Sequence, residues 1–404
     1  MAKKIKIAFI KFAGMSAGGT EKFLQTIAAN LSRDRFEVDY FYCDSAPYIG
    51  SNFVHPDTSG ERLLYMQQHN VNLVKFKVKA KDVTSGVHEW VDTDFWEFFD
   101  ESKYDIIQTG RAGHPEYPFN KIRKTPIVDS LHLFAGVDNQ TNISRVMHLC
   151  QWSADKWISA GGDRQRVVLV SHPMDIPNKD YGNLRSELGL EEKFIFGFHQ
   201  RNDDRIFSPY PLEAYQKIQD ANNAFLLLGG GQAYREQARE LGLKNIFFLP
   251  HSANPDGIYK FLSTLNVYAH GRKDGEINST AMAEAMFFGL PIVSHISKIN
   301  NGHVECIGSA GKVVNSVSDY IKELQALQND QEYYKKKSAA AKQRFSEKYE
   351  LKSQIANIEN IYEQILANPF PNKILRILSS FRIKYLLLFS FVRLFNKLKR
   401  TFNF

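Results

Sequence analysis

The sequence predicts an α/β protein in which two doubly wound parallel sheets face each other across a cleft, followed by a C-terminal helical tail. Three observations favour this fold class. The 404 residues exceed one ordinary core and fit two domains of roughly 150–200 residues each. Short apolar runs alternate with helical patterns along the body of the chain, which is typical of parallel sheets wrapped by helices. The alternation relaxes between residues 171 and 193, where prolines break regular structure.

The first half of the chain, residues 1–175, is expected to form one domain. Its N-terminal segment turns polar too soon for a secretory signal, so we interpret it as the first strand. The apolar runs that predict strands in this half are residues 4–10, 36–43, 73–78, 104–108, 126–131 and 167–170. The helical pattern after the first strand places five apolar side chains on one face, namely Phe23, Leu24, Ile27, Ala28 and Leu31.

The second half, residues 176–350, repeats this pattern after a boundary marked by His172-Pro173 and Ile176-Pro177. Its apolar runs are residues 194–198, 224–228, 246–249, 267–269 and 291–293. A helix over residues 351–368 is expected to return towards the first domain, and residues 369–404 form a separate tail. Doubly wound sheets bind ligands at the carboxyl ends of their strands, so two facing sheets predict a deep interdomain cleft.

Composition and charge exclude several classes of protein. The 43% hydrophobic and 24% charged content is that of a soluble globular protein rather than a disordered or membrane-spanning one. The three cysteines, Cys43, Cys150 and Cys306, lie far apart, which argues against a disulfide framework or a four-thiolate zinc site and favours a reducing, cytoplasmic compartment. From Asn372 onward eight Lys and Arg residues meet no Asp or Glu, so the net charge of +7 reflects the tail and predicts no nucleic-acid partner.

A glycine-rich turn joins the first predicted strand to the first predicted helix. Gly18 and Gly19 would let the backbone approach a ligand, and the free N–H groups of a helix N-terminus favour a phosphate. A tight turn without a ligand, with Thr20 as a helix cap, explains the same pattern about as well. The glycine run at residues 229–231 favours a plain turn.

Two glutamates eight positions apart mark a second candidate site. Glu276 is expected in the loop after a strand and Glu284 in the second turn of the next helix, so the two carboxylates are placed to grip separate hydroxyl groups. Free N–H groups from Asn278 to Thr280 would meet a diphosphate between them. The alternative is a solvated loop glutamate and a surface glutamate on an Ala-rich helix.

These segments, taken in order, resemble the family 4 glycosyltransferases of the GT-B fold, which are retaining enzymes with two Rossmann-like domains. The resemblance runs from about residue 4 to residue 367. The matching elements are residues 18–21 with the family's GGxE loop, residues 125–132 with its strand ending in an active-site histidine, residues 170–175 with its interdomain segment, Glu276 and Glu284 with its E-x7-E motif, and residues 301–305 with a later glycine-to-glutamate element.

The family's diphosphate-binding basic pair, an Arg and then a Lys, has a partial counterpart. Arg201 matches the arginine and Arg205 stands in for the lysine, which keeps the charge but changes reach and geometry. The adjacent Asp203 and Asp204 leave open a surface charge cluster. A second departure is Asn278-Ser279 where the family often has Phe-Gly, which bears on the identity of the sugar.

The resemblance implies transfer of a sugar from a nucleotide diphosphate donor to a sugar or lipid-linked acceptor, with retention. It implies that Arg201 and Arg205 neutralise the departing diphosphate, helped by the backbone near Ser279 and Thr280, while Glu276 and Glu284 bind the sugar and the ribose. His132 would orient the donor sugar from the first domain. Because the arginines replace Mg²⁺, and the histidines show no metal-binding spacing, no cofactor or catalytic metal is expected.

The basic tail has the pattern of an amphipathic helix. Its longest apolar run, residues 385–392, is too short for a bilayer span of ~20 residues. We interpret residues 372–404 as lying on an anionic membrane surface, which makes the protein cytoplasmic and peripheral. Packing of this helix onto the protein itself or onto a partner is the alternative.

Two other functions remain open at this point. A GT-B sugar-nucleotide epimerase would release a free product without an acceptor. A non-catalytic protein would bind sugar nucleotides or membrane surfaces while retaining the fold, although the presence of His132, Arg201 and both glutamates argues against it.

Overall fold

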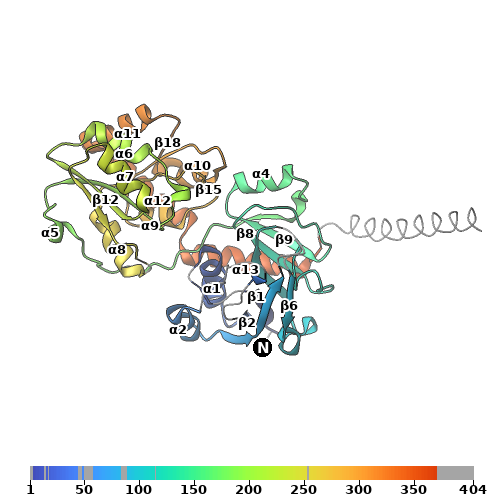
Figure 1. Ribbon diagram of the computed structural model, residues 1–404. Coiled ribbons are helices and arrows are strands. Elements are labelled where there is room, and N and C mark those ends of the chain that lie inside the picture. The colour runs from blue at the N-terminus through green and yellow to red at the C-terminus, as the bar shows by residue number, and fades with distance from the viewer. Residues whose placement is uncertain are drawn as a thin grey trace, which may run out of the picture.

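The computed structural model describes residues 3–12, 15–16, 18–43, 48–49, 58–82, 89–113, 115–252 and 254–370. Two lobes stand side by side, each built on its own parallel sheet (Figure 1). The arrangement confirms the predicted fold class of two facing α/β units. The predicted membrane-surface tail, residues 372–404, lies outside the described residues.

The sheet of the first lobe has seven strands in the order β10-β9-β8-β7-β1-β2-β4, and all neighbouring strands are parallel. Its strands are β1 (Ile5–Lys11), β2 (Phe36–Cys43), β4 (Asn72–Phe76), β7 (Ile106–Arg111), β8 (Ile127–Leu131), β9 (Ile143–His148) and β10 (Val167–Leu169). A smaller sheet beside it contains β3 (Tyr48–Ile49), β5 (Val78–Asp82) and β6 (Glu89–Thr93).

Helices cover this first sheet on both faces. They are α1 (Gly19–Asn30), α2 (Gly60–Gln68), α3 (Phe95–Phe98), η1 (Glu101–Lys103), α4 (Gln151–Ser159), η2 (Arg164–Arg166) and α13 (Leu351–Ala367). The predicted apolar face of α1 is buried from Phe23 to Leu31. The C-terminal α13 also belongs to this core, because Ile358 and Tyr362 are fully buried in it and the Tyr362 hydroxyl donates to Gln108 Oε1 at 2.9 Å.

The sheet of the second lobe has six parallel strands in the order β13-β12-β11-β14-β16-β18. They are β11 (Phe194–Gln200), β12 (Asn223–Gly229), β13 (Ile246–Leu249), β14 (Val267–Ala269), β16 (Ile292–His295) and β18 (Gly311–Val314). A separate parallel pair joins β15 (Gly275–Glu276) to β17 (Asn300–Asn301).

The second lobe's helices surround one large apolar core. They are α5 (Arg185–Leu188), η3 (Asp204–Ile206), α6 (Tyr210–Ile218), α7 (Gln232–Glu240), α8 (Pro255–Thr264), α9 (Thr280–Phe287), α10 (Gly302–Ile307), η4 (Gly308–Ala310), α11 (Val317–Asn329) and α12 (Gln331–Lys348). None of the described helices combines the length and apolar character that a bilayer span requires.

The chain crosses between the lobes twice, and the two crossings touch. The first crossing contains Met174 and the second lies between α12 and α13. The backbone N–H of Met174 donates to the carbonyl of Tyr349 at 2.9 Å, and Met174 forms a parallel bridge with Glu350. These two hydrogen-bonded segments therefore connect the lobes.

Candidate functional site

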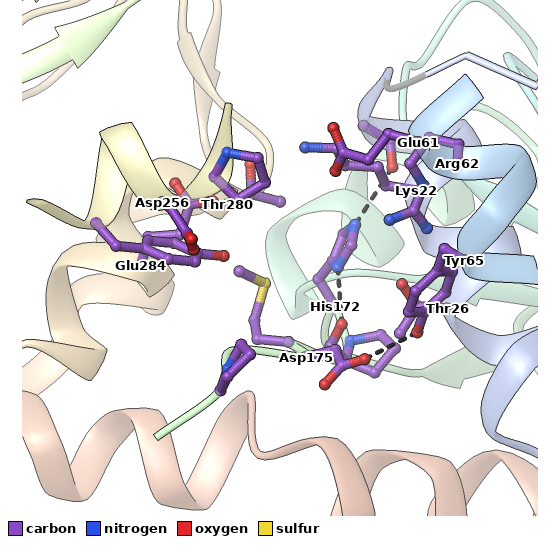
Figure 2. Close-up of a pocket in the computed structure, with 16 residues that line it drawn as sticks. Lys22, Thr26, Glu61, Arg62, Tyr65, His172, Asp175, Asp256, Thr280 and Glu284 are labelled. Atoms are coloured by element: carbon purple, nitrogen blue, oxygen red, sulfur yellow. Dashed lines mark hydrogen bonds between the residues drawn. The ribbon is translucent and has the colours of Figure 1, made fainter. Parts of the chain in front are cut away.

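Two adjoining cavities lie between the lobes, at the carboxyl ends of the strands. We call the first the arginine cavity, because Arg201 and Arg272 line it, and its volume is about 290 Å³. We call the second the linker cavity, because residues 172–175 line it, and its volume is about 320 Å³ (Figure 2). Gly19 and Thr280 line both, so the cavities meet between the N-terminus of α1 and that of α9.

Glu276, which the sequence predicted to lie in a loop, belongs to the short strand β15 and lines the arginine cavity. Its carboxylate accepts a hydrogen bond from Arg272 Nη1 at 3.0 Å, and His270 Nε2 lies 3.9 Å away. Burial raises the pKa of Glu276 to about 7, with Arg272 opposing the rise and Asp274 adding to it. The backbone is fixed here by the β15–β17 pair, and a Cβ at Gly275 would lie 1.9 Å from the Asn300 carbonyl oxygen.

Glu284, the helix carboxylate, lines the linker cavity instead. It lies on α9, where His199 Nε2 is 3.1 Å from its Oε2. The hydroxyl of Tyr268 in turn donates to the His199 carbonyl at 3.2 Å, which anchors that histidine at the end of β11. The two glutamates therefore serve neighbouring cavities, separated by the first turn of α9.

The segment between the two glutamates leads into α9 and forms one wall of the arginine cavity. Asn278, Ser279 and Thr280 all line this cavity. The Ser279 side chain caps α9 by accepting from the Met282 N–H at 3.3 Å. The helix N-terminus therefore faces the cavity with its positive dipole end, which suits an anion.

The two arginines of the expected basic pair meet at the carboxylate of Asp203, but only one of them lines the arginine cavity. Arg201 lines the arginine cavity, and its Nη2 lies 3.0 Å from Asp203 Oδ2. Arg205 lines neither cavity: its side chain is 87% exposed and grips the same carboxylate at 2.8 and 2.9 Å. These contacts, the Arg205 hydrogen bond first, lower the pKa of Asp203 to about 2. Arg205 therefore belongs to a surface charge cluster, the alternative that the neighbouring aspartates left open.

The second cation of the arginine cavity is Arg272, which the sequence did not single out. Its guanidinium forms hydrogen bonds to Asp274 at 2.6 and 2.9 Å and to Glu276 at 3.0 Å. In the sequence this residue belongs to a charged loop, GRKDGE, that is typical of a solvated surface. The sequence signal that could have identified it is its position just after β14 and four residues before Glu276, because ligands bind at the carboxyl ends of the strands.

His132 follows β8 as expected but lines neither cavity as the side chains stand. Its ring packs against Phe23, with centroids 4.8 Å apart, and its buried Nε2 has no hydrogen-bond partner within the described part of the chain. Burial, then the charges of His172 and Lys11, lower its pKa well below the usual value, so the ring is neutral at pH 7.

A histidine of the first crossing between the lobes, His172, does line the linker cavity, just as His199 and His270 line the arginine cavity. Its Nε2 is 3.2 Å from the Gly19 carbonyl oxygen, and its ring packs on the other side of Phe23 at 5.2 Å. The sequence treated this residue only as part of an interdomain motif. Its contact with Gly19 ties that segment to the glycine turn.

The glycine turn also lies at the cavities. Gly18 directly precedes α1, and a Cβ there would lie 2.3 Å from Glu21 Oε2. Gly19 leaves open space where a side chain would project, and it lines both cavities. Over the described residues, no group of three or more His, Cys, Asp or Glu side chains has the arrangement of a metal site.

The second lobe resembles a known protein family in sequence. Residues 181–344 match the family model described as "Glycosyl transferases group 1". This segment contains Arg201, Arg272, Glu276 and Glu284. No curated protein matches the chain in sequence.

Solved structures share the fold over nearly the whole chain. HepE from Anabaena, crystallised with UDP and glucose, is 19% identical, with a TM-score of 0.64 over 89% of this chain and 100% of HepE. A glycosyltransferase from Rickettsia africae is 12% identical, with a TM-score of 0.67 over 91% of this chain and 100% of its own. Sucrose-phosphate synthase from Thermosynechococcus elongatus is 14% identical, with a TM-score of 0.65 over 90% and 100%. The fold is therefore that of GT-B glycosyltransferases.

Proposed function

We propose that this protein transfers a sugar from a nucleotide diphosphate sugar to an acceptor hydroxyl, with retention and without a catalytic metal. One observation carries the proposal. A cavity at the facing carboxyl edges of two GT-B lobes combines Arg201, Arg272, the N-terminus of α9 and the carboxylate of Glu276. The match of residues 181–344 to group 1 glycosyl transferases and the UDP in HepE support a nucleotide sugar as the donor.

In this proposal the donor diphosphate lies against Arg201 and the first N–H groups of α9. Positive charge placed there in advance stabilises the negative charge that develops as the diphosphate departs, and it does so most strongly where water is excluded. A Mg²⁺ ion serves the same purpose in other transferases. We expect the protein to transfer sugar at an undiminished rate in the presence of EDTA. If EDTA abolishes transfer and added Mg²⁺ restores it, the metal-independent step is contradicted.

The two glutamates bind opposite parts of the donor. Glu276 accepts hydrogen bonds from the sugar hydroxyls in the arginine cavity, while Glu284 holds the ribose at the border with the linker cavity. His132, being neutral, approaches the sugar when the lobes close. The acceptor enters from the first lobe through the linker cavity.

The assignment is tested with a mass-spectrometric screen of UDP-, GDP- and other nucleotide sugars, followed by transfer assays on the donor that binds. Arg201→Ala and Glu284→Ala are each expected to reduce transfer by ~10²-fold or more. Near-normal transfer by both variants excludes this site. Epimerised sugar nucleotide formed from donor alone identifies an epimerase, and binding without any turnover identifies a non-catalytic protein. The anomeric configuration of the product, read by NMR, tests retention.

The proposed peripheral location at a membrane rests on the sequence of residues 372–404 alone. A lipid-linked acceptor would be met at such a surface. Deletion of residues from Asn372 onward is expected to release the protein from anionic vesicles in a flotation assay. Equal vesicle binding by the truncated and full-length chains excludes the idea.

A further inference from the structure

The first-lobe wall of the linker cavity carries two cations that form no ion pair with any described residue. Lys22 and Arg62 both line it, from α1 and α2, and Figure 2 shows them next to each other on that wall. Neither has an ion-pair partner among the described residues. This differs from Arg201 and Arg272 in the neighbouring cavity, which both pair with aspartates.

The carboxylates around the same cavity are largely engaged elsewhere. Asp175 accepts from the Tyr65 hydroxyl at 2.9 Å, Asp256 pairs with Lys179 at 2.9 Å, and Glu284 lies 3.1 Å from His199. Glu61 directly precedes Arg62 on α2 and also lines the cavity; its charge acts on Arg62 through space, but its side chain is exposed and forms no ion pair with Arg62. The side chains of Lys22 and Arg62 therefore keep hydrogen-bond donors that no described carboxylate engages.

Arg62 is held in place by neighbouring side chains rather than by a counter-ion. Its Nε donates to Gln25 Oε1 at 2.6 Å, and the Gln25 amide is itself oriented by donating to the Ser16 carbonyl at 3.0 Å. The guanidinium stacks on the Tyr65 ring at 4.3 Å. This fixes the group at the cavity wall without neutralising it.

The environment makes this charge costly in the absence of a ligand. Burial lowers the pKa of Arg62, although an arginine stays protonated at neutral pH, and its Nη2 is buried with no hydrogen-bond partner among the described residues. A partly buried cation without a counter-charge is unfavourable unless an anion or a hydrogen-bond acceptor joins it. Lys22 adds a second charge, which contributes, after burial, to lowering the pKa of His172.

We propose that Lys22 and Arg62 form a subsite for an anionic group, a phosphate or a carboxylate, on the acceptor. The inference rests on the proposed function, since it names the acceptor class for the same cleft. The linker cavity meets the arginine cavity at Gly19 and Thr280, so an acceptor anchored by its anion at Lys22 and Arg62 extends its hydroxyl towards the donor sugar. The planar guanidinium offers paired donors that suit either anion.

The test compares three ligands that share one ring: glucose 6-phosphate, glucuronate and glucose. Calorimetry is performed on the full chain with saturating UDP, so that the diphosphate site is already filled. The wild-type protein is expected to bind at least one charged sugar at least about tenfold more tightly than glucose, and the tighter of the two identifies the anion. The Lys22→Gln/Arg62→Gln double variant is expected to lose this preference while its affinity for UDP is unchanged.

Lys217→Gln, which removes an exposed charge on α6 of the second lobe, is the matched control and should keep the preference. Thermal unfolding shows whether each variant is folded, and each single variant separates the two cations if the double variant is unstable. Equal binding of charged and neutral sugars by the wild-type protein, or a preference that survives in the folded variants, overturns the subsite. If UDP does not bind, the nucleotide identified by the donor screen replaces it. Absence of binding by every nucleotide contradicts the proposed function instead, and the charged sugars then test the subsite alone.

Discussion

Glu276 is the residue whose protonation state matters most to the proposed chemistry. Its carboxylate is surrounded by Arg272, Asp274, His270 and, at longer range, Arg201, while its backbone N–H donates to His303 Nδ1. Burial disfavours its charged form, while the arginines favour it. The balance leaves its pKa at about 7, so the group changes charge close to neutral pH.

This balance predicts the acidic limb of the activity profile. A charged Glu276 is the better acceptor for sugar hydroxyls, so kcat/KM is expected to fall as the pH drops through about 7 in the wild-type protein. Arg272→Gln removes the opposing charge and frees Asp274 to repel, which raises the pKa of Glu276 further. The midpoint of the limb should therefore move upward by about one to two pH units.

Arg272→Lys is the control for charge, because it keeps a cation but not the fork that holds both carboxylates. Its limb is expected between those of the wild-type protein and Arg272→Gln. An unchanged midpoint in Arg272→Gln, with transfer still measurable, would contradict the role assigned to this arginine. The assay is the pH dependence of kcat/KM for donor consumption.

The local sequence predicted where residues lie along the chain, but it did not predict which partners their side chains choose. Glu276 and Glu284 were predicted to meet a ligand, and both line cavities of the cleft. Arg205 was predicted with them, but its near neighbour Asp203 captures it at the surface. Arg272 was not identified because the charged segment that contains it, together with Asp274 and Glu276, is typical of a solvated loop.

At the scale of elements, a contact between α4 and α10 joins the two lobes. The carboxylate of Glu305 accepts from the backbone N–H of Gln151 at 2.7 Å, at the N-terminus of α4. The N-cap residue, Cys150, supplies no side-chain cap; its Sγ donates to the Ile277 carbonyl at 3.1 Å. The second lobe therefore caps a helix of the first.

This contact predicts a measurable loss of stability. Glu305→Ala leaves the first N–H groups of α4 without an acceptor and removes a negative charge from the helix N-terminus, so we expect a loss of about 1 kcal/mol in the free energy of unfolding. Urea denaturation followed by circular dichroism measures it. Glu305→Gln, which keeps an acceptor oxygen, should lose less. Glu240→Ala, at an exposed position on α7, should change little, and a Glu305→Ala midpoint equal to that of wild type would exclude the cap.

The apolar runs predicted most strands of the two main sheets, but β9 and β18 were not among them. The strand β9 was missed because Ser144, Arg145 and His148 interrupt its apolar pattern, yet all its residues are buried. Tertiary contacts engage two of them: Ser144 donates to the Pro369 carbonyl, and His148 Nδ1 lies 3.1 Å from Ser153 Oγ. Because these partners lie outside the strand, the local apolar pattern could not predict it.

For the whole molecule, the open question is how His132 reaches a donor. The sequence placed a domain boundary near residues 171–193, and the structure adds that the first crossing is hydrogen-bonded to the second, from Met174 to Tyr349. Two adjacent backbone segments are a suitable hinge, because small torsional changes in both rotate one lobe without disturbing either core. His132 lines neither cavity here, so its proposed contact with the sugar requires such a rotation.

The last prediction is therefore closure on donor binding. The radius of gyration from small-angle X-ray scattering is expected to decrease when the wild-type protein is saturated with its donor, because bound diphosphate and sugar draw both lobes together and exclude water. His132→Ala should still close but transfer more slowly, since the histidine acts after the rotation. Glu284→Ala, weakened in donor binding, should not close at the same donor concentration. If calorimetry proves the donor bound while the scattering curve stays that of the free protein, the lobes do not close, and His132 loses its place in the mechanism.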